Sequence, residues 1–338
     1  MNVDPLDARA RPGLHGVPFE CPHDHGPLRQ QESGLLCEQC GRHYPFVGGV
    51  PVLINEESSV FAIADYTDGP GYEGASYGQA SERASPLRRG WRRFARALSD
   101  SPTSLRYPGP GDAIAYVARE HPNPRVLVIG SGGLQVGDAG SRVVHTDVAL
   151  GPEIAAIADA HDLPFPDASF DLVIAVAVLE HVADPFRCVA EMRRVLAPAG
   201  HVYAVTPFLQ PVHMGAYDFT RFTPIGHRRL FRHFDEVGAG LAMGAGSVAA
   251  YTLKGFLLSL SNRKPWRYFA QALCLFCSPP LRKLDRWLPH SADAAGCCWF
   301  FGRQRDGDPV SDRDLIASYR EDFGARAAKS GRQAQLGA

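Results

Sequence analysis

Short apolar segments that alternate with helical segments from residue 111 onward constrain the fold of this chain more than any other feature. Four of them have the composition and length of buried strands: VLVIG at 126–130, RVVHTD at 142–147, FDLVIAVAV at 170–178 and HVYAVTPF at 201–208. A later segment, AGCCWFFGRQ at 295–304, is predicted to return to the same sheet. Strands separated by helical crossovers predict an α/β fold with a doubly wound, mostly parallel sheet that helices cover on both faces.

One crossover helix is predicted between the third and fourth of these strands. The segment DPFRCVAEMRRVLAPAG places its apolar residues on one broad face at helical spacing. Asp184 is suited to cap this helix and Pro185 to occupy its first position, whereas Pro198 and Gly200 end it.

Composition divides the chain into four regions. Residues 17–55 form a small module rich in Cys, His and Gly. Residues 56–110 are rich in Gly, Ser, Pro and Tyr and are interpreted as a linker or lid with one helix around Trp91. The α/β domain then covers 111–304 with a helical insertion at 251–290, and a polar tail follows at 305–338.

Charge and cysteine usage bear on partners and compartment. The formal net charge of −1 provides no global attraction to nucleic acid or to an anionic membrane. The N-terminal segment MNVDPLDARARPG has no apolar core like that of a secretory signal, and no apolar run reaches the roughly 18 residues of a membrane-spanning helix. The eight cysteines cluster unevenly, unlike a disulfide framework. The sequence therefore predicts a cytoplasmic protein with reduced thiols.

A glycine-rich turn follows the first predicted strand. Gly130, Ser131, Gly132 and Gly133 allow the turn to pass close to a ligand, at the strand ends where open α/β sheets bind ligands. Position 135 is Gln, where the dinucleotide pattern has another glycine, and this argues against a nicotinamide cofactor.

Two aspartates follow the next predicted strands. A carboxylate at Asp147 can accept hydrogen bonds from both hydroxyls of a ribose, although an isolated aspartate there equally suits a turn. Asp159 ends a third short strand, where a carboxylate can accept from the exocyclic amine of adenine.

The run from 126 to 208 resembles the class I S-adenosylmethionine-dependent methyltransferases. The resemblance rests on DAHDLPFPDASFDLV, LEHVADP and EMRRVLAPAG, in that order. It implies a Rossmann-like, seven-stranded sheet that binds S-adenosylmethionine. The glycine turn would lie against the methionine part of the cofactor, and Asp147 would hold the ribose. Asp159 and Ala160 would contact the adenine edge, with Glu180 and His181 flanking the site after the fourth strand.

A second cluster of polar residues follows the predicted strand at 201–208. Within TPFLQPVHMGAYDFTRFT, His213, Asp218 and Arg221 lie among aromatic and proline residues, and the methyltransferase resemblance continues here beside the acceptor site. His213 or His181 is the candidate base for a hydroxyl or protonated amine acceptor. Asp218 would orient a histidine or bind substrate, and Arg221 would pair with Asp218 or an acidic substrate group. An Asp218–Arg221 structural bridge, with His213 packed in the loop, explains the same residues equally well.

The N-terminal module resembles the small zinc-ribbon domain that partners tRNA and protein methyltransferases. Cys37 and Cys40 form one intact knuckle, whereas the other has Cys21 followed by Asp24 at the second ligand position. Three cysteines completed by Asp24, or by His23 or His25, would hold a structural zinc ion. Alternatively, the metal site has decayed and the apolar residues of the module maintain its fold.

These features predict an S-adenosylmethionine-dependent methyltransferase that acts on a small-molecule, glycan or lipid-linked acceptor. The apolar insertion at 251–290 could touch a membrane surface. A tRNA or protein methyltransferase is the alternative that the ribbon module suggests. Near-neutral charge and the absence of an NPPY-like segment after the fourth strand argue against it and against a nucleic-acid partner. A scaffold that binds the cofactor without catalysis is a third interpretation. The sequence does not specify the oligomeric state.

Overall fold

The computed structural model describes residues 13–69, 71–72, 105–134, 136–137, 142–151, 153–288 and 292–319. The helix expected around Trp91 and the part of the expected tail beyond residue 319 lie outside these residues.

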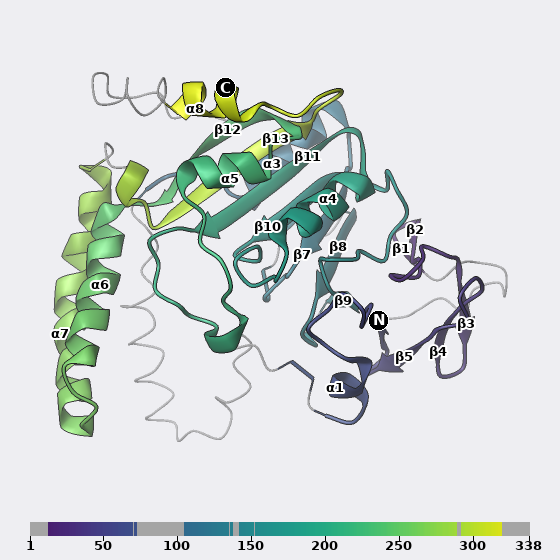
Figure 1. The fold of residues 1–338 in the computed structure, drawn as a ribbon, viewed down its shortest axis with the longest axis horizontal. Coiled ribbons are helices and arrows are strands. Elements are labelled where there is room, and N and C mark those ends of the chain that lie inside the picture. Colours follow the sequence, from purple (N-terminus) through teal and green to yellow (C-terminus); the bar gives the residue numbers. More distant parts are fainter. Residues whose placement is uncertain are drawn as a thin grey trace.

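A mixed, mostly parallel sheet forms the centre of the molecule (Figure 1). Seven of its strands are β7 (Arg125–Ile129), β8 (Arg142–Asp147), β9 (Ile154–Ala158), β10 (Phe170–Val176), β11 (Leu196–Pro207), β12 (Phe234–Met243) and β13 (Cys297–Gln304). They lie in the order β12-β13-β11-β10-β7-β8-β9. The pairs from β11 to β9 are parallel, and β13 is antiparallel to both of its neighbours. The expected Rossmann-like α/β fold is confirmed.

The sheet is longer than the seven strands that the resemblance implies, because the N-terminal module continues it. The added strands are β3 (Leu28–Gln31), β4 (Gly34–Cys37), β5 (His43–Val47) and β6 (Val50–Leu53). Strand β6 pairs in parallel with β9, so the sheet contains eleven strands. A separate hairpin, β1 (Gly13–Leu14) and β2 (Val17–Pro18), precedes them. Leu35 and Tyr44 of the module belong to the same buried cluster as β7 and β10.

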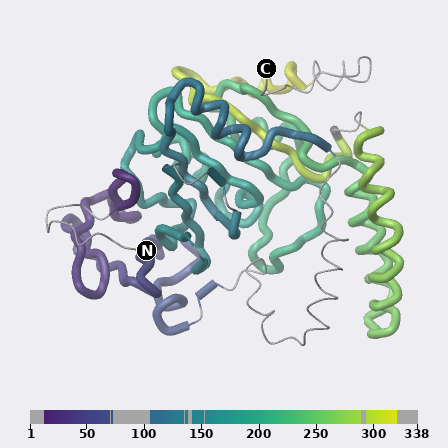
Figure 2. The backbone as a smooth tube through the Cα atoms, turned by 180° about the vertical axis from the view of Figure 1, so that it is seen from behind, coloured from purple at the N-terminus to yellow at the C-terminus, as the bar shows by residue number. Residues whose placement is uncertain are grey.

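Alternating side chains of the central strands face two apolar layers. On β7, Val126 and Val128 belong to the cluster that includes α3 (Pro110–Glu120). Leu127 and Ile129 belong to the cluster that includes α4 (Pro185–Val195). Figures 1 and 2 show α3 on one face of the sheet and α4 on the other.

The predicted start of α4 is confirmed. The Asp184 carboxylate accepts a hydrogen bond from the Arg187 N–H at 3.0 Å, and Pro185 occupies the first turn. The helix ends at Val195, before the expected Pro198, because β11 begins at Leu196.

Two long helices lie outside these two apolar layers. Helices α6 (Ala245–Ser259) and α7 (Lys264–Lys283) form a hairpin between β12 and β13, at one side of the molecule in both views (Figures 1 and 2). The helical region that was expected to begin at 251 therefore begins earlier, at Ala245. In the part of the chain that the structure describes, no helix combines the length and apolar character needed to cross a membrane. The remaining helices are α1 (Ile63–Thr67), α5 (Pro224–Leu230) and α8 (Asp312–Tyr319), with single turns η2 (Gly215–Tyr217), η3 (Leu284–Arg286) and η4 (Ala292–Ala294).

Candidate functional site

The backbone conformation of the turn after β7 favours glycine at three positions. Gly130, Gly132 and Gly133 have φ values of +57°, +57° and +81°, in the left-handed region. A Cβ at Gly130 would lie 2.5 Å from the Val178 Cγ2 atom, so the backbone there packs directly against the segment after β10. The turn therefore presents bare backbone at the carboxyl edge of the sheet.

Asp147 at the end of β8 braces this turn. One carboxylate oxygen accepts from the Gly132 N–H at 2.9 Å, and the other accepts from the Ala149 N–H at 2.9 Å. Ser131, also in the turn, lies 3.0 Å from the His145 Nδ1 through its hydroxyl. The Asp147 side chain is buried.

Asp159 at the end of β9 is held from both sides. It accepts from His161 Nδ1 at 2.6 Å and from the Ser59 hydroxyl at 2.5 Å. Burial acts to lower the pKa of His161, but the hydrogen bond with Asp159 outweighs it and the pKa is raised. His161 Nε2 accepts in turn from the Asp184 N–H at 3.0 Å, which connects this aspartate to the start of α4. The neighbouring Ala160 is buried.

The segment after β6 closes the same edge of the sheet. The Asn55 amide and the Ser58 hydroxyl donate to Asp162, and Tyr66 of α1 donates to the Val148 carbonyl at 2.6 Å. Phe61, Tyr72 and Tyr217 form a cluster of rings with centroids 5.0–5.6 Å apart. These rings line a pocket of about 450 Å³ together with α1.

Glu180, beyond the end of β10, is fully buried. Neither of its carboxylate oxygens has a hydrogen-bond partner among the described residues. Burial raises the pKa of this carboxyl to about 8. Its backbone carbonyl accepts from the N–H groups of Phe219 and Thr220 at 2.8 and 3.2 Å, which holds the loop after β11 against the site.

The four residues expected to carry catalysis lie together. His181 Nδ1 donates to the Tyr217 carbonyl at 2.7 Å, and its Nε2 is 3.0 Å from the Nε2 of His213. Asp218 accepts from the His213 N–H at 2.9 Å and forms a two-pronged ion pair with Arg221. The hydrogen bonds with Arg221 lower the pKa of Asp218 to about 2, and burial lowers the pKa of His181. The Asp218–Arg221 bridge is therefore present, and it supports His213 from the side opposite His181.

The cysteine cluster of the N-terminal module consists of two turns of the same shape. In the first, the His25 N–H donates to the Cys21 carbonyl at 2.8 Å; in the second, the Gly41 N–H donates to the Cys37 carbonyl at 3.1 Å. His25 and Gly41 also share positive φ values, of 55° and 75°. Asp24 therefore occupies the place in the first turn that Cys40 occupies in the second.

The ligand-type atoms of this cluster converge. One atom each from Cys21, Asp24, Cys37 and Cys40 lie within 4.8 Å of one another. The two sulfur atoms of Cys21 and Cys40 are 3.7 Å apart, and Cys37 Sγ lies 3.4 Å from Asp24 Oδ1.

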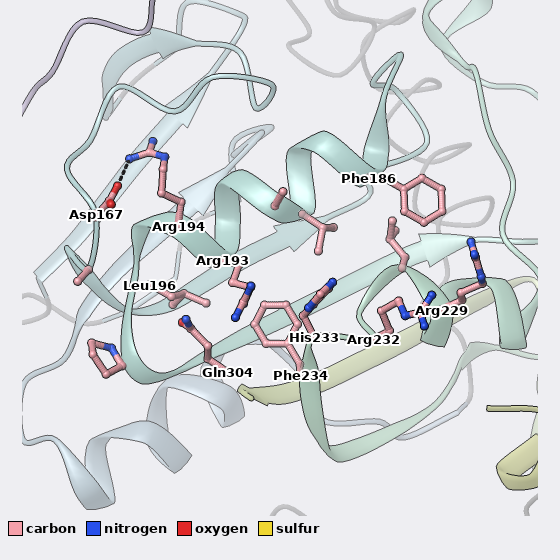
Figure 3. A pocket seen from close by; sticks show the side chains of 15 residues that line it. Asp167, Phe186, Arg193, Arg194, Leu196, Arg229, Arg232, His233, Phe234 and Gln304 are labelled. Atoms are coloured by element: carbon pink, nitrogen blue, oxygen red, sulfur yellow. Dashed lines mark hydrogen bonds and ion pairs between the residues drawn. The ribbon is translucent and has the colours of Figure 1, made fainter. Parts of the chain in front are cut away.

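A second pocket, of about 550 Å³, lies against α4 and the starts of β11 and β12 (Figure 3). Its lining includes four basic or titratable side chains, those of Arg193, Arg229, Arg232 and His233 (Figure 3). Leu196 in its wall is the first residue of β11, so this pocket is at the opposite end of the strands from the glycine turn.

Comparison with known proteins agrees with the resemblance to methyltransferases. Residues 134–204 match the family model described as a methyltransferase domain. Residues 134–204 of this chain are therefore similar to the methyltransferase domain of class I, S-adenosylmethionine-dependent enzymes.

Individual relatives match only over part of their length. A ubiquinone/menaquinone biosynthesis C-methyltransferase of Psychromonas ingrahamii is 40% identical over 68 residues, 19% of this chain and 27% of that protein. A demethylmenaquinone methyltransferase of Renibacterium salmoninarum is 38% identical over 114 residues, 30% of this chain and 46% of that protein. The solved structure of Burkholderia thailandensis 1,6-didemethyltoxoflavin-N1-methyltransferase, with 1,6-didemethyltoxoflavin and S-adenosylhomocysteine bound, is 14% identical with a TM-score of 0.37. That match covers 67% of this chain and 93% of that structure's chain. The chain thus spans less than half the length of these two curated relatives.

Several residues at the candidate site were missed by the sequence analysis. Ser58 and Ser59 reach the edge of the domain from a segment that was interpreted as a linker, and no local pattern indicates that contact. His161 and Asp162 directly follow Asp159 and Ala160 in the motif, so their position offered a signal.

Proposed function

We propose that the chain transfers a methyl group from S-adenosylmethionine to an acceptor bound beside Glu180, His181 and His213. The observation that carries this proposal is the turn at Gly130, where a Cβ would clash with Val178, next to the buried carboxylate of Asp147. Bare backbone and a neighbouring carboxylate suit a ligand with a flexible charged end and a ribose.

The residues of the site fit this cofactor. The glycine turn would hold the methionine part, and Asp147 would accept hydrogen bonds from the ribose while keeping those from Gly132 and Ala149. Asp159 and Ala160 would border the adenine. Asp159 already accepts from Ser59 and His161, which fixes its orientation.

When bound, S-adenosylmethionine supplies an electrophilic methyl whose C–S bond breaks as the acceptor bond forms, with the sulfur keeping the electron pair. In the proposal His213 or His181 takes the proton of a hydroxyl acceptor, and Asp218 with Arg221 positions His213. Glu180 excludes water from the methyl's surroundings because its segment is buried.

Cofactor binding is tested by calorimetric titration with S-adenosylmethionine and S-adenosylhomocysteine. We expect micromolar binding that weakens roughly 100-fold in Asp147→Ala, because hydrogen bonds to a charged group contribute about 1.5–3 kcal/mol each. Asp167→Ala is the matched control, since Asp167 is exposed and lines the pocket at the opposite strand ends. Absence of binding to folded wild-type protein would contradict the proposal. Binding without turnover on any acceptor would favour the scaffold interpretation.

We also propose that Cys21, Asp24, Cys37 and Cys40 hold a structural zinc ion. Zn–S bonds of about 2.3 Å in a tetrahedral site place sulfur ligands about 3.8 Å apart, close to the 3.7 Å between Cys21 and Cys40. The backbone N–H groups of Gln39 and Cys40 lie 3.4 Å from the Cys37 sulfur. The Tyr44 hydroxyl lies 3.1 Å from the Cys21 sulfur. Such contacts orient and stabilise thiolate ligands. Among the described residues, neither His23 nor His25 joins this cluster.

The helical hairpin favours an acceptor at an anionic membrane surface, such as a lipid-linked molecule. Phe269, Leu273 and Phe276 follow helical spacing along α7 and are exposed. Residues 245–288 contain seven Lys or Arg and one acidic residue, Asp285, which is buried. The buried Asp285 carboxylate accepts from the Gly246 N–H at 2.7 Å and fixes the base of the hairpin. An apolar stripe with flanking cations matches the chemistry of anionic lipid interfaces.

Vesicle binding tests this assignment. We expect the protein to bind phosphatidylglycerol vesicles and Phe269→Ser/Phe276→Ser to weaken binding by at least about tenfold, because each phenyl ring buried contributes roughly 1.5–3 kcal/mol. Phe186→Ser is the matched control, since Phe186 is similarly exposed but lies on α4. Co-sedimentation with vesicles measures both, and binding that is equal in the double variant and the wild type would contradict the assignment.

A further inference from the structure

We infer that Glu180, His181 and His213 form a binding site for a divalent transition-metal ion, separate from the cysteine cluster. One ligand-type atom from each of the three lies within 4.8 Å of the others. The set of two imidazole nitrogens and one carboxylate oxygen suits Zn²⁺, Fe²⁺ or Co²⁺.

The distances between the three ligand atoms match a metal centre. The two Nε2 atoms of His181 and His213 are 3.0 Å apart, and they lie 3.6 and 3.8 Å from Glu180 Oε1. A triangle with these sides has a circumradius of about 2.0 Å, the length of Zn–N and Zn–O bonds. A single ion can therefore contact all three atoms without movement of the backbone.

Both imidazoles are held with Nε2 toward this point. His181 Nδ1 donates to the Tyr217 carbonyl at 2.7 Å, so its Nε2 carries the lone pair. His213 Nδ1 lies 3.5 Å from both the Asp218 carboxylate and the Arg221 guanidinium. Metal-binding histidines commonly donate their second nitrogen to a carbonyl or a carboxylate. In the tautomer of His213 whose Nδ1 donates to Asp218, the two Nε2 lone pairs face each other at 3.0 Å, an arrangement that a cation relieves. Without an ion, the other tautomer accepts from Arg221 at Nδ1 and donates from Nε2 to His181.

The Glu180 carboxylate provides an independent indication of a ligand. It is fully buried, and neither oxygen has a hydrogen-bond partner among the described residues. Buried carboxylates are usually paired or bound to a metal, because an isolated one is costly. The Arg221 guanidinium bonds to Asp218, to backbone carbonyls and to His213, and no hydrogen bond joins it to Glu180 among the described residues. The two histidines are the ligand-type groups that lie within reach of Glu180.

The position of the site indicates a role for the metal ion. Val178, two residues before Glu180, contacts the turn at Gly130, so the metal lies beside the proposed methyl donor. Three protein ligands leave a coordination position open for an oxygen atom. This use rests on the proposed function: the ion would bind a hydroxyl of the acceptor and lower its pKa, so that the hydroxyl would release its proton to solvent and its oxygen would take the methyl group. The ion would then replace His181 and His213 as the means of activating the acceptor, because their Nε2 atoms would be bound to it. Metal binding itself does not depend on methyl transfer.

Cobalt binding distinguishes this site from the cysteine cluster. The full chain is stripped with a chelator and dialysed against Co²⁺, which gives an intense charge-transfer absorption only when thiolates bind it. We expect about one ion per chain beyond those that this absorption accounts for. His213→Ala should bind that ion at least about tenfold more weakly, as should Glu180→Gln, which preserves the side-chain volume. His121→Ala is the control, since His121 is exposed at the end of α3.

The outcomes separate the two proposals. Loss of the non-thiolate ion in both variants, with retained thiolate absorption and an unchanged melting temperature, supports the site. No ion beyond those bound to thiolates, or equal retention in wild type and His213→Ala, overturns it. Calorimetry with S-adenosylmethionine is run on the protein before chelation: failure to bind there contradicts the proposed function but leaves the cobalt result standing.

Discussion

Extraction of zinc from the cluster of Cys21, Asp24, Cys37 and Cys40 is expected to unfold strands β3–β6 and to weaken S-adenosylmethionine binding together. Structural zinc contributes roughly 10 kcal/mol or more to the folding of small peptides. In this chain β6 is also held by its pairing with β9, so we expect a smaller loss of about 3–5 kcal/mol in the free energy of unfolding. Denaturant unfolding before and after chelation measures this difference.

The coupling to the cofactor follows from the chain that leaves β6. Within six residues of its end, Asn55, Ser58 and Ser59 donate to Asp162 and Asp159. If β6 separates from β9, Asp159 loses the Ser59 hydroxyl and the proposed adenine edge loses its support. Each lost bond to a carboxylate amounts to about 1.5–3 kcal/mol, so the affinity should fall roughly tenfold or more.

Cys37→Ser should reproduce the effect of chelation. Cys277→Ser is the matched control, because Cys277 is a partly exposed thiol on α7, outside the cluster. An unfolding free energy that neither chelation nor Cys37→Ser changes would contradict the zinc proposal. Lost stability with unchanged cofactor affinity would contradict only the coupling.

Local patterns predicted the parts of the fold that local forces determine. The apolar runs identified β7, β8, β10 and β13, and the Asp-Pro pair located the start of α4. The glycines at 130, 132 and 133 indicated a tight turn after the first strand, and all three have positive φ values, which favour glycine. In each case the decisive interaction lies within a few residues of the signal.

Contacts between distant segments were not predictable from these patterns. VPVLI at 50–54 indicates a strand, but nothing in it specifies pairing of Val52 with Ile157, more than 100 residues later. For the same reason, the hydrogen bond from Ser59 to Asp159 and the packing of Tyr66 beside Val148 were missed. The roles of His213 and Asp218 stay predictions, although the structure brings both to Glu180.

Acidification is expected to destabilise the fold steeply because two buried histidines must remain neutral. Burial lowers the pKa of His227 to about 3 and that of His201 to about 4. In the unfolded chain both titrate near pH 6.5, so below that pH the unfolded state binds protons that the folded state excludes. Their contribution to stability is complete above about pH 6.5 and is lost as the pH falls toward the folded pKa values. For each unit by which the pH falls below about 6.5, each histidine should lower the unfolding free energy by up to about 1.4 kcal/mol.

His227→Gln isolates one of these contributions, since glutamine does not titrate. Between pH 6 and pH 5, we expect the unfolding free energy of this variant to fall by about 1.2 kcal/mol less than that of wild type, whatever its stability at pH 7. The matched control is His43→Gln, because His43 is exposed on β5. Denaturant unfolding at several pH values measures the slopes, and every other titrating group cancels in the comparison. Parallel slopes for His227→Gln and wild type would mean that the His227 imidazole is protonated inside the fold. The apolar contacts with Phe231 and Phe300 that surround it make such a buried charge unfavourable.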